Sequence, residues 1–242
     1  MTGASRGIGA ATAKLLAARG FAVLVNYAND EAAAGEVVAG IRRAGGIAVA
    51  CRADVSKEKE VVAMFDAAAR DLGYVSGLVN NAGVTGGFAR LEDVSAKRVE
   101  HVLAVNVLGA ILCAREAVRR MSTRRKGSGG AIVNVGSLVA RTGGANDWVH
   151  YAASKGAVHS LTLGLAREVA GEGIRVNCLA PGLIDTDLHA AAGQPDRLER
   201  LRPGIPMQRP GTAQEVAAGI VWLLSEESSY VTGAIVEMGG GR

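Results

Sequence analysis

The feature that most constrains the fold of this chain is an alternation of short apolar runs with longer stretches of helical periodicity, which continues from one end to the other. Runs such as 22–25 and 131–135 are almost continuously apolar. Parallel strands that are covered by helices on both faces have this composition. We predict strands at Phe21–Tyr27, Ile47–Arg52, Gly77–Asn80, Ala131–Val135, Ile174–Leu179 and Ala234–Met238.

Helical stretches separate these strands, and the alternation predicts an α/β fold with a doubly wound parallel sheet, Rossmann-like, and helices on both faces. A length of 242 residues lies in the upper range of one domain, so residues 1–242 are predicted to form a single domain. The predicted helices are Gly9–Arg19, Glu31–Ala44, Lys57–Leu72, Ala96–Met121, His150–Ala170 and Ala213–Ser225.

Charge and composition argue against several classes of function. The net charge is +4, but basic and acidic residues are interleaved, and only 4% of residues are aromatic, so there is no stacking platform for a nucleic acid. The densest basic run is interpreted as the solvated end of a helix, where cations favour the helix dipole. It consists of Arg119, Arg120, Arg124, Arg125 and Lys126.

Cysteine and histidine patterns predict neither a disulfide framework nor a metal site. Cys51, Cys113 and Cys178 lie far apart in apolar segments with no C-x-x-C pair, and the four histidines form no ligand motif. Buried free thiols are typical of a reducing compartment. Neither a signal peptide nor an apolar run approaching about 18 residues is apparent, so we expect a cytoplasmic protein that does not span a membrane.

A glycine-rich segment, Thr2–Gly9, opens the first predicted helix. Its glycines let the backbone approach a pyrophosphate at a helix N-terminus, where free N–H groups and the helix dipole favour anions. Such a loop normally follows a strand. Either Met1 is the last residue of that strand or several residues precede it, and we favour the second because losing a central strand would leave its two neighbours unpaired.

Four further motifs follow this segment: Asp54-Val55, Asn80-Asn81-Ala82-Gly83, Tyr151-Ala152-Ala153-Ser154-Lys155, and Pro181-Gly182 with Thr186. Together with T-G-x-x-x-G-x-G at Thr2–Gly9, their order and spacing resemble those of the short-chain dehydrogenase/reductase family. The resemblance extends from residue 2 to the C-terminus. It implies an oxidoreductase that transfers a hydride between a nicotinamide cofactor and a carbonyl or alcohol.

The charges of the residues expected around the adenosine ribose favour NADP(H) over NAD(H). The strand at 21–27 ends in Asn26 and Tyr27 with no carboxylate, whereas an acidic residue there would accept hydrogen bonds from an unphosphorylated ribose. Arg6 lies in the glycine-rich loop, where a guanidinium can bind a 2′-phosphate.

The resemblance also implies the remaining cofactor contacts. Asp54 and Val55 would hold the adenine, the turn of Asn81, Ala82 and Gly83 would support the central part of the cofactor, and Ile184 and Thr186 would lie near the carboxamide and phosphates. The full set expected at the cofactor is Gly3, Ser5, Arg6, Gly7, Ile8, Gly9, Asn26, Tyr27, Asp54, Val55, Asn81, Ala82, Gly83, Tyr151, Lys155, Pro181, Gly182, Ile184 and Thr186.

Tyr151 and Lys155 are four residues apart in a helical stretch, so their side chains share one face. A free tyrosine has a pKa of ~10, and a nearby ammonium, joined by the charge of an oxidised nicotinamide, is expected to lower that pKa toward neutrality. The resemblance implies that Tyr151 exchanges the proton of the substrate oxygen and that Lys155 also binds the nicotinamide ribose.

Ser137 follows a predicted strand, at the edge of the sheet where sites form in open α/β folds. By resemblance, its hydroxyl orients the substrate oxygen, and Gly136 stands where many members of the family have a second serine. Asn106 matches the asparagine that kinks a helix and supports a water leading protons to the lysine; its alternative role is that of a buried amide in a helix.

Three substrate classes are consistent with the sequence: beta-ketoacyl thioesters of an acyl carrier protein, sugars or polyols, and other ketones. Arg124, Arg125 and Arg167 are candidates for docking an acidic carrier protein, and residues 184–210 for a substrate lid. Trp148 either stacks on substrate or packs in the core. A homotetramer is implied by resemblance. The alternatives are a family isomerase or dehydratase, for which the chain is short, and a catalytically silent dinucleotide-binding regulator or scaffold.

Overall fold

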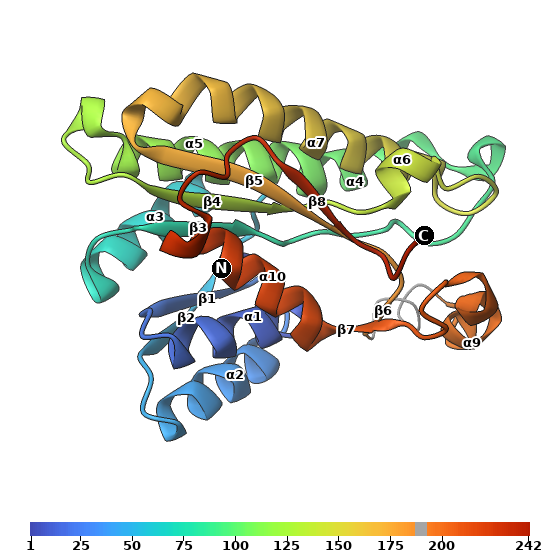
Figure 1. Ribbon diagram of the computed structural model, residues 1–242, viewed down its shortest axis with the longest axis horizontal. Coiled ribbons are helices and arrows are strands. Elements are labelled where there is room, and N and C mark those ends of the chain that lie inside the picture. The colour runs from blue at the N-terminus through green and yellow to red at the C-terminus, as the bar shows by residue number, and fades with distance from the viewer. Residues whose placement is uncertain (187–192) are drawn as a thin grey trace.

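A computed structural model describes residues 1–186 and 193–242 and shows the predicted α/β architecture around parallel strands (Figure 1). Four strands pair in the order β3-β4-β5-β8, and β1 pairs with β2, with Val23 opposite Ala48 and Tyr27 opposite Arg52. The strands are β1 (Val23–Tyr27), β2 (Ala48–Arg52), β3 (Gly77–Asn80), β4 (Gly130–Val135), β5 (Ile174–Pro181) and β8 (Ile235–Met238).

Residues 1–4 lie between β1 and β3 and join the two groups of strands. The Thr2 N–H donates to the Val79 carbonyl at 3.0 Å, and the Met1 carbonyl accepts from Asn26 N at 3.1 Å. Beyond Met1, a cavity of about 290 Å³ runs between the same two strands and is lined by residues that include Leu24 and Leu78.

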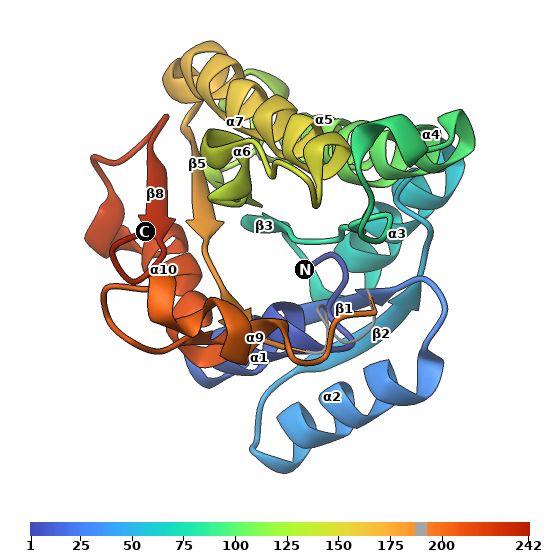
Figure 2. The same ribbon diagram turned by 90° about the vertical axis from the view of Figure 1, so that its right-hand side faces the viewer.

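Helices cover both faces of the strands (Figures 1 and 2). One layer contains α1 and α10, which pack closely together, with α2 beside α1, and the other contains α3, α5 and α7. The bounds of five helices differ from the predicted ones by at most two residues: α1 (Gly7–Ala18), α2 (Glu31–Arg43), α3 (Glu58–Leu72), α7 (Val149–Val169) and α10 (Ala213–Leu224). The sixth, α5 (Gly109–Met121), is the second part of the long helix predicted at 96–121.

The long helix predicted at 96–121 is interrupted at its centre. It consists of α4 (Ala96–Leu103), a π-helical turn at Ala104–Leu108, and α5. By length and composition alone this helix could cross a membrane. It packs against β3, β4 and α7, as a core helix does, so its length and composition are only weak evidence for a span.

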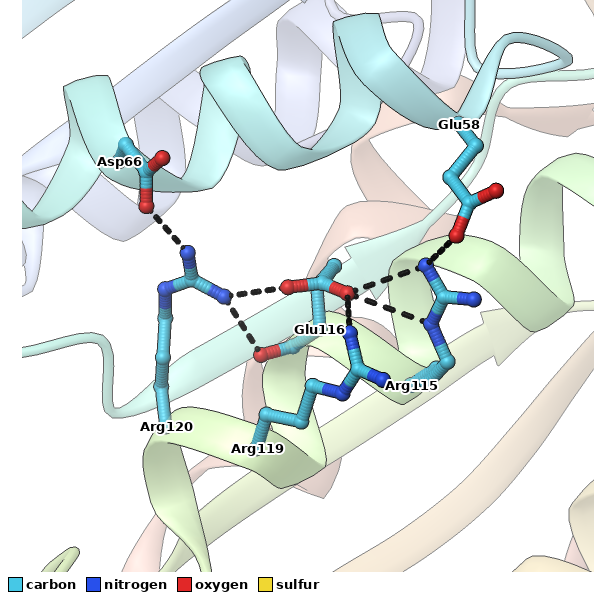
Figure 3. Close-up of polar contacts among 6 residues, drawn as sticks. All are labelled: Glu58, Asp66, Arg115, Glu116, Arg119 and Arg120. Atoms are coloured by element: carbon cyan, nitrogen blue, oxygen red, sulfur yellow. Dashed lines mark hydrogen bonds and ion pairs between the residues drawn. The ribbon is translucent and has the colours of Figure 1, made fainter.

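A buried carboxylate organises the basic end of α5 (Figure 3). The Glu116 side chain is 3% exposed and lies 2.7 Å from Arg119 and 2.7 Å from Arg120, while Arg120 also pairs with Asp66 on α3. Arg115 contacts Glu116 as well. The interpretation of this basic run as a solvated surface is therefore wrong for Arg120, whose side chain is only 21% exposed and ties α5 to α3.

Short elements that the sequence did not predict follow the carboxyl ends of β4 and β5. They are α6 (Val139–Thr142), β6 (Ile184–Asp185), α9 (Arg197–Leu201) and β7 (Gly211–Thr212). Of the lid range 184–210, positions 187–192 lie outside the described residues. Single turns of 3-10 helix occupy Leu91–Asp93, Thr123–Arg125, Ala170–Glu172, Arg202–Gly204 and Glu226–Ser228.

Candidate active site

The glycine-rich loop leaves the N-terminus of α1 open toward an anion. Arg6 precedes the helix in an extended conformation, and no side chain in the described part of the chain caps the first turn, which contains no acidic residue. Gly7 has a φ of +53°, and a Cβ at Gly9 would lie 2.2 Å from the Gly3 carbonyl oxygen. Only glycine therefore fits at position 9, and the free N–H groups can meet a phosphate.

A cavity of about 720 Å³ extends from this loop across the ends of β1, β2 and β3. Pro181, Gly182 and Ile184 lie outside its lining, as do the side chains of Tyr151 and Lys155. The expected cofactor residues that do line it are Gly3, Ser5, Arg6, Gly7, Ile8, Gly9, Asn26, Tyr27, Asp54, Val55, Asn81, Ala82, Gly83 and Thr186.

Asn26 does not offer a free side chain to this cavity. Its amide accepts from Gly3 N–H at 3.1 Å and donates to the Ala53 carbonyl at 2.9 Å, and the residue is 2% exposed. The Asn26 side chain holds the glycine-rich loop against β1 and the end of β2, and a contact of Asn26 with the cofactor stays a prediction.

Arg52 was missed by the sequence reasoning, although it lines the cavity at the end of β2. It lies opposite Tyr27 in the strand register. The carboxyl ends of neighbouring parallel strands meet at one edge of a sheet, so this position could have been found from the predicted strands. Lys57, Glu60 and His101 also line the cavity.

Asp54 is oriented by the turn that follows it. Its Oδ1 accepts from the N–H and the hydroxyl of Ser56, at 3.0 and 2.7 Å. Burial would raise the pKa of Asp54, but these hydrogen bonds and Lys57 lower it below its usual value. The carboxylate is thus ionised and fixed at the wall of the cavity.

Asn81 joins the end of β3 to the glycine-rich loop. Its Nδ2 donates to the Thr2 carbonyl at 3.0 Å and to the Gly3 carbonyl at 2.8 Å. The Thr2 hydroxyl accepts in return from the backbone N–H of Asn81 and Ala82. The two segments that form the floor of the cavity are therefore held together by four hydrogen bonds.

Tyr151 and Lys155 share one face of α7, and both are buried. The Lys155 Nζ donates to the Val135 carbonyl at 2.7 Å and lies 5.7 Å from the centroid of the Tyr151 ring. Burial raises the pKa of Tyr151 to about 12, although a hydrogen bond with the Ser137 side chain lowers it, and burial lowers the pKa of Lys155 to about 8. Burial is the largest cause of the raised pKa of Tyr151. The lowering expected from the ammonium together with an oxidised nicotinamide stays a prediction.

Ser137 stands two residues beyond the end of β4, with its hydroxyl accepting from Val139 N–H at 3.2 Å. The absence of a side chain at Gly136 has a structural reason. A Cβ at that position would lie 2.6 Å from Cys178 Sγ and 2.6 Å from His159 Nε2. His159 and Cys178 thus occupy the space behind β4 that a second serine would need.

Asn106 lies in the π-helical turn and is 2% exposed. Its Oδ1 accepts from Val84 N–H at 2.8 Å, and its Nδ2 donates to the Val84 carbonyl and to the Ser154 hydroxyl. The helix is interrupted by this π-helical turn at the position where the resemblance implied a kink. The side chain connects the loop after β3 to α7 one residue from Lys155.

Two further aromatic rings lie beside Tyr151. Trp148 packs edge-on against Tyr151 with centroids 5.4 Å apart, and it stacks on Phe88 at 4.4 Å. The Leu138 side chain is directed toward Gly182 and Gly239. Trp148 is 7% exposed and forms part of a ring stack beside Tyr151.

Comparison with known sequences identifies relatives over the whole chain. A family model described as enoyl-(acyl carrier protein) reductase matches residues 3–242. An uncharacterized oxidoreductase, YgfF, of Escherichia coli K12 is 52% identical, with 100% of this chain and 98% of the relative covered. Glucose 1-dehydrogenase 2 of Bacillus subtilis is 37% identical, with 100% and 92% covered.

A solved structure has the same fold. The short chain dehydrogenase from Burkholderia cenocepacia J2315 in complex with NADP has a TM-score of 0.91 and 35% sequence identity, with 99% of this chain and 95% of that chain covered.

Proposed function

The chain belongs to the short-chain dehydrogenase/reductase family, and on that premise we propose that it is an NADP(H)-dependent oxidoreductase that acts on a carbonyl or alcohol. One observation carries the proposal. The Lys155 Nζ lies 3.6 Å from the position that a Cβ of Gly83 would take, and Gly83 lines the 720 Å³ cavity. The pair of Tyr151 and Lys155 therefore adjoins the cavity that suits a dinucleotide.

The residues at the cavity fit a phosphorylated dinucleotide. The open N-terminus of α1 and the left-handed Gly7 form a cradle for the pyrophosphate. Arg6 and Arg52 supply two guanidinium groups for a 2′-phosphate at the ends of α1 and β2, and Asp54 and Val55 line the adenine side. A carboxylate does line this region at Asp30, but it accepts from Ala33 N–H as the N-cap of α2.

The proposed mechanism uses three side chains of the chain itself. When it is bound, the nicotinamide supplies or accepts the hydride. In reduction, the Tyr151 hydroxyl donates its proton to the substrate oxygen, and its raised pKa keeps it protonated at neutral pH. Ser137 donates a hydrogen bond to the same oxygen, and Lys155 binds the nicotinamide ribose and stabilises the phenolate left on Tyr151. Asn106 acts through Ser154 and Val84 by holding α7 in place.

The single domain would carry both cofactor and substrate, with part of 184–210 serving as a lid. The closing segment includes α9, which contacts the wall formed by Phe88 and Trp148. The catalytically silent regulator is disfavoured because both Tyr151 and Lys155 are present and buried at the cavity edge.

Exposed side chains support a proposal about the partners of the protein, and buried cysteines support one about its location in the cell. Two groups of exposed apolar residues support assembly into a homotetramer: Leu103, Leu108, Ile111 and Leu163 on α4, the π-helical turn, α5 and α7, and Trp222 and Tyr230 near α10. Arg125 and Arg167 are exposed and available to an acyl carrier protein, whereas Arg124 pairs with Glu172. We propose a cytoplasmic location, since Cys113 and Cys178 are buried free thiols.

Purified protein mixed with NADPH or NADH and with ketones, beta-ketoacyl thioesters, enoyl thioesters and sugars tests the function. The absorbance of the reduced nicotinamide reports turnover. Oxidation of NADPH in preference to NADH by any carbonyl compound supports the proposal. Turnover of enoyl thioesters alone would replace carbonyl reduction by reduction of a double bond. Cofactor binding without turnover of any class would favour the regulator.

A further inference from the structure

One charged side chain outside the proposed catalytic group is buried beside it. Arg197 begins α9, and its side chain is 9% exposed. Its Cζ lies 4.6 Å from the centroid of the Phe88 ring and 4.7 Å from that of Trp148. Because Trp148 packs against Tyr151, the guanidinium lies on the ring stack that leads to the reacting position.

The guanidinium of Arg197 is only partly satisfied. Its Nη2 lies 2.8 Å from Asp147 Oδ2, and its Nη1 donates to Gln194 Oε1 at a long 3.4 Å. Its Nε is fully buried, and within 1–186 and 193–242 no acceptor lies at hydrogen-bonding distance. Buried donors almost always have a partner, so this N–H calls for one that the described residues do not provide.

A purely structural role for Arg197 leaves this N–H unexplained. The ion pair with Asp147 and the contact with two rings are enough to hold α9 against the start of α7. Holding α9 needs no free Nε, and a buried donor without a partner opposes folding. Because Asp147 already balances the charge of Arg197, the missing partner can be a neutral or an anionic oxygen.

We propose that Arg197 determines substrate specificity: its Nε donates a hydrogen bond to a second oxygen of the substrate, distinct from the oxygen that reacts at Tyr151. The body of such a substrate would pack on Trp148 and Phe88, whose rings provide an apolar wall. The substrate class is thus a ketone, or the matching alcohol, that bears a hydroxyl, carbonyl or carboxylate oxygen on an apolar frame. This inference rests on the proposed function.

The test compares three ketones of one frame with NADPH as cofactor: cyclohexanone and its derivatives with a hydroxyl or a carboxylate opposite the carbonyl. The variants are Arg197→Met, which keeps the stem of the side chain, and Arg197→Lys, which keeps the charge for Asp147 but removes the Nε. Arg200→Met on the same helix is the matched control, since among the described residues the Arg200 side chain hydrogen-bonds only Gln194.

We expect the native protein to prefer at least one substituted ketone over cyclohexanone by about tenfold or more in kcat/KM, mainly through KM, as one hydrogen bond to a charged donor allows. Both Arg197 variants should lose this preference, and Arg200→Met should keep it. A preference for the carboxylate alone identifies an anionic second group, and an equal preference for both derivatives identifies a neutral acceptor.

Two results would overturn the inference: a native protein without preference, or variants in which kcat/KM falls equally for all three ketones, as loss of a structural contact predicts. If NADPH binds but none of the ketones is reduced, the same comparison is made on dissociation constants of the three compounds with the NADPH complex, and equal constants overturn it. Failure to bind NADPH would instead refute the proposed function.

Discussion

The Lys155 Nζ donates to the Val135 carbonyl at 2.7 Å and stands 5.7 Å from the centroid of the Tyr151 ring, so the ammonium is held between the end of β4 and the face of the tyrosine. Both groups are buried, which favours their neutral forms. Burial lowers the pKa of Lys155 to about 8 and raises that of Tyr151 to about 12. The lysine is therefore the group that titrates near neutral pH.

The rate of carbonyl reduction should fall as the pH rises through about 8, because Lys155 loses its charge while Tyr151 remains protonated. A profile of kcat/KM against pH measures this. The Lys155→Met variant should reduce the carbonyl slowly, and its kcat/KM should no longer fall as the pH rises through about 8. If kcat/KM of the variant still falls over this pH range, another group is responsible for the titration.

Lys155 also predicts a pH dependence of stability. Its pKa is 10.5 unfolded and about 8 folded, so between these values the unfolded chain binds more protons. The free energy of unfolding contributed by this group should then increase from about pH 8 to about pH 10.5. Urea unfolding of the native protein and of Lys155→Met across this range checks the sign, and an identical slope in both would contradict it.

The sequence predicted helices and strands well in segments where the periodicity of apolar residues extends over the whole element. It did not predict the π-helical turn, because Asn106 is held there by Val84, 22 positions earlier, and by Ser154, 48 positions later. Short α9 likewise depends on Arg197 reaching Asp147, Phe88 and Trp148. Interactions between distant residues leave no local pattern.

For the candidate site, the motifs identified most of the cavity lining but not the state of the side chains. Asn26 was expected at the cofactor, yet its amide is used by the backbone of Gly3 and Ala53. The effect of burial, which raises the pKa of Tyr151, could not be read from the sequence, because the extent of burial is a property of the packed structure. Arg52 was overlooked although strand pairing places it beside Tyr27.

Arg6 and Arg52 should set the preference for NADPH. Either residue changed to alanine should weaken NADPH binding by about tenfold to a hundredfold, the value of a charge-assisted hydrogen bond, and leave NADH binding nearly unchanged. Arg19→Ala, at the far end of α1 and outside the cavity, is the control. Fluorescence titration of both cofactors measures the ratio, and equal losses for NADH and NADPH would exclude a contact with the 2′-phosphate.

Gly9→Ala should abolish binding of both cofactors, since the new Cβ would lie 2.2 Å from the Gly3 carbonyl oxygen and displace the loop. Gly35→Ala is the matched control: Gly35 is exposed within α2, with nothing within 4 Å of an added Cβ, and should gain up to about 1 kcal/mol of stability. Calorimetric titration and thermal unfolding measure both effects. Tight cofactor binding by Gly9→Ala would refute the role of the loop.

Glu116→Gln should destabilise the fold by roughly 3 kcal/mol, because three arginines would lose the buried carboxylate that they share. The arginines hold the pKa of Glu116 below its usual value against the effect of burial, so its contribution is present above the unfolded pKa and is lost as the pH falls through the folded pKa. Glu58→Gln, an exposed partner of Arg115, should have little effect. Equal unfolding midpoints for both variants would contradict this.

The most direct test of the central claim is the single-turnover oxidation of NADPH by Tyr151→Phe with whichever carbonyl substrate the native protein reduces. The change removes one oxygen atom, and the proton that it carries is worth about 10²- to 10⁴-fold in rate. We predict a loss of this size with an unchanged dissociation constant for NADPH. A variant that reduces the substrate at the native rate would contradict the assignment of Tyr151 as the proton donor.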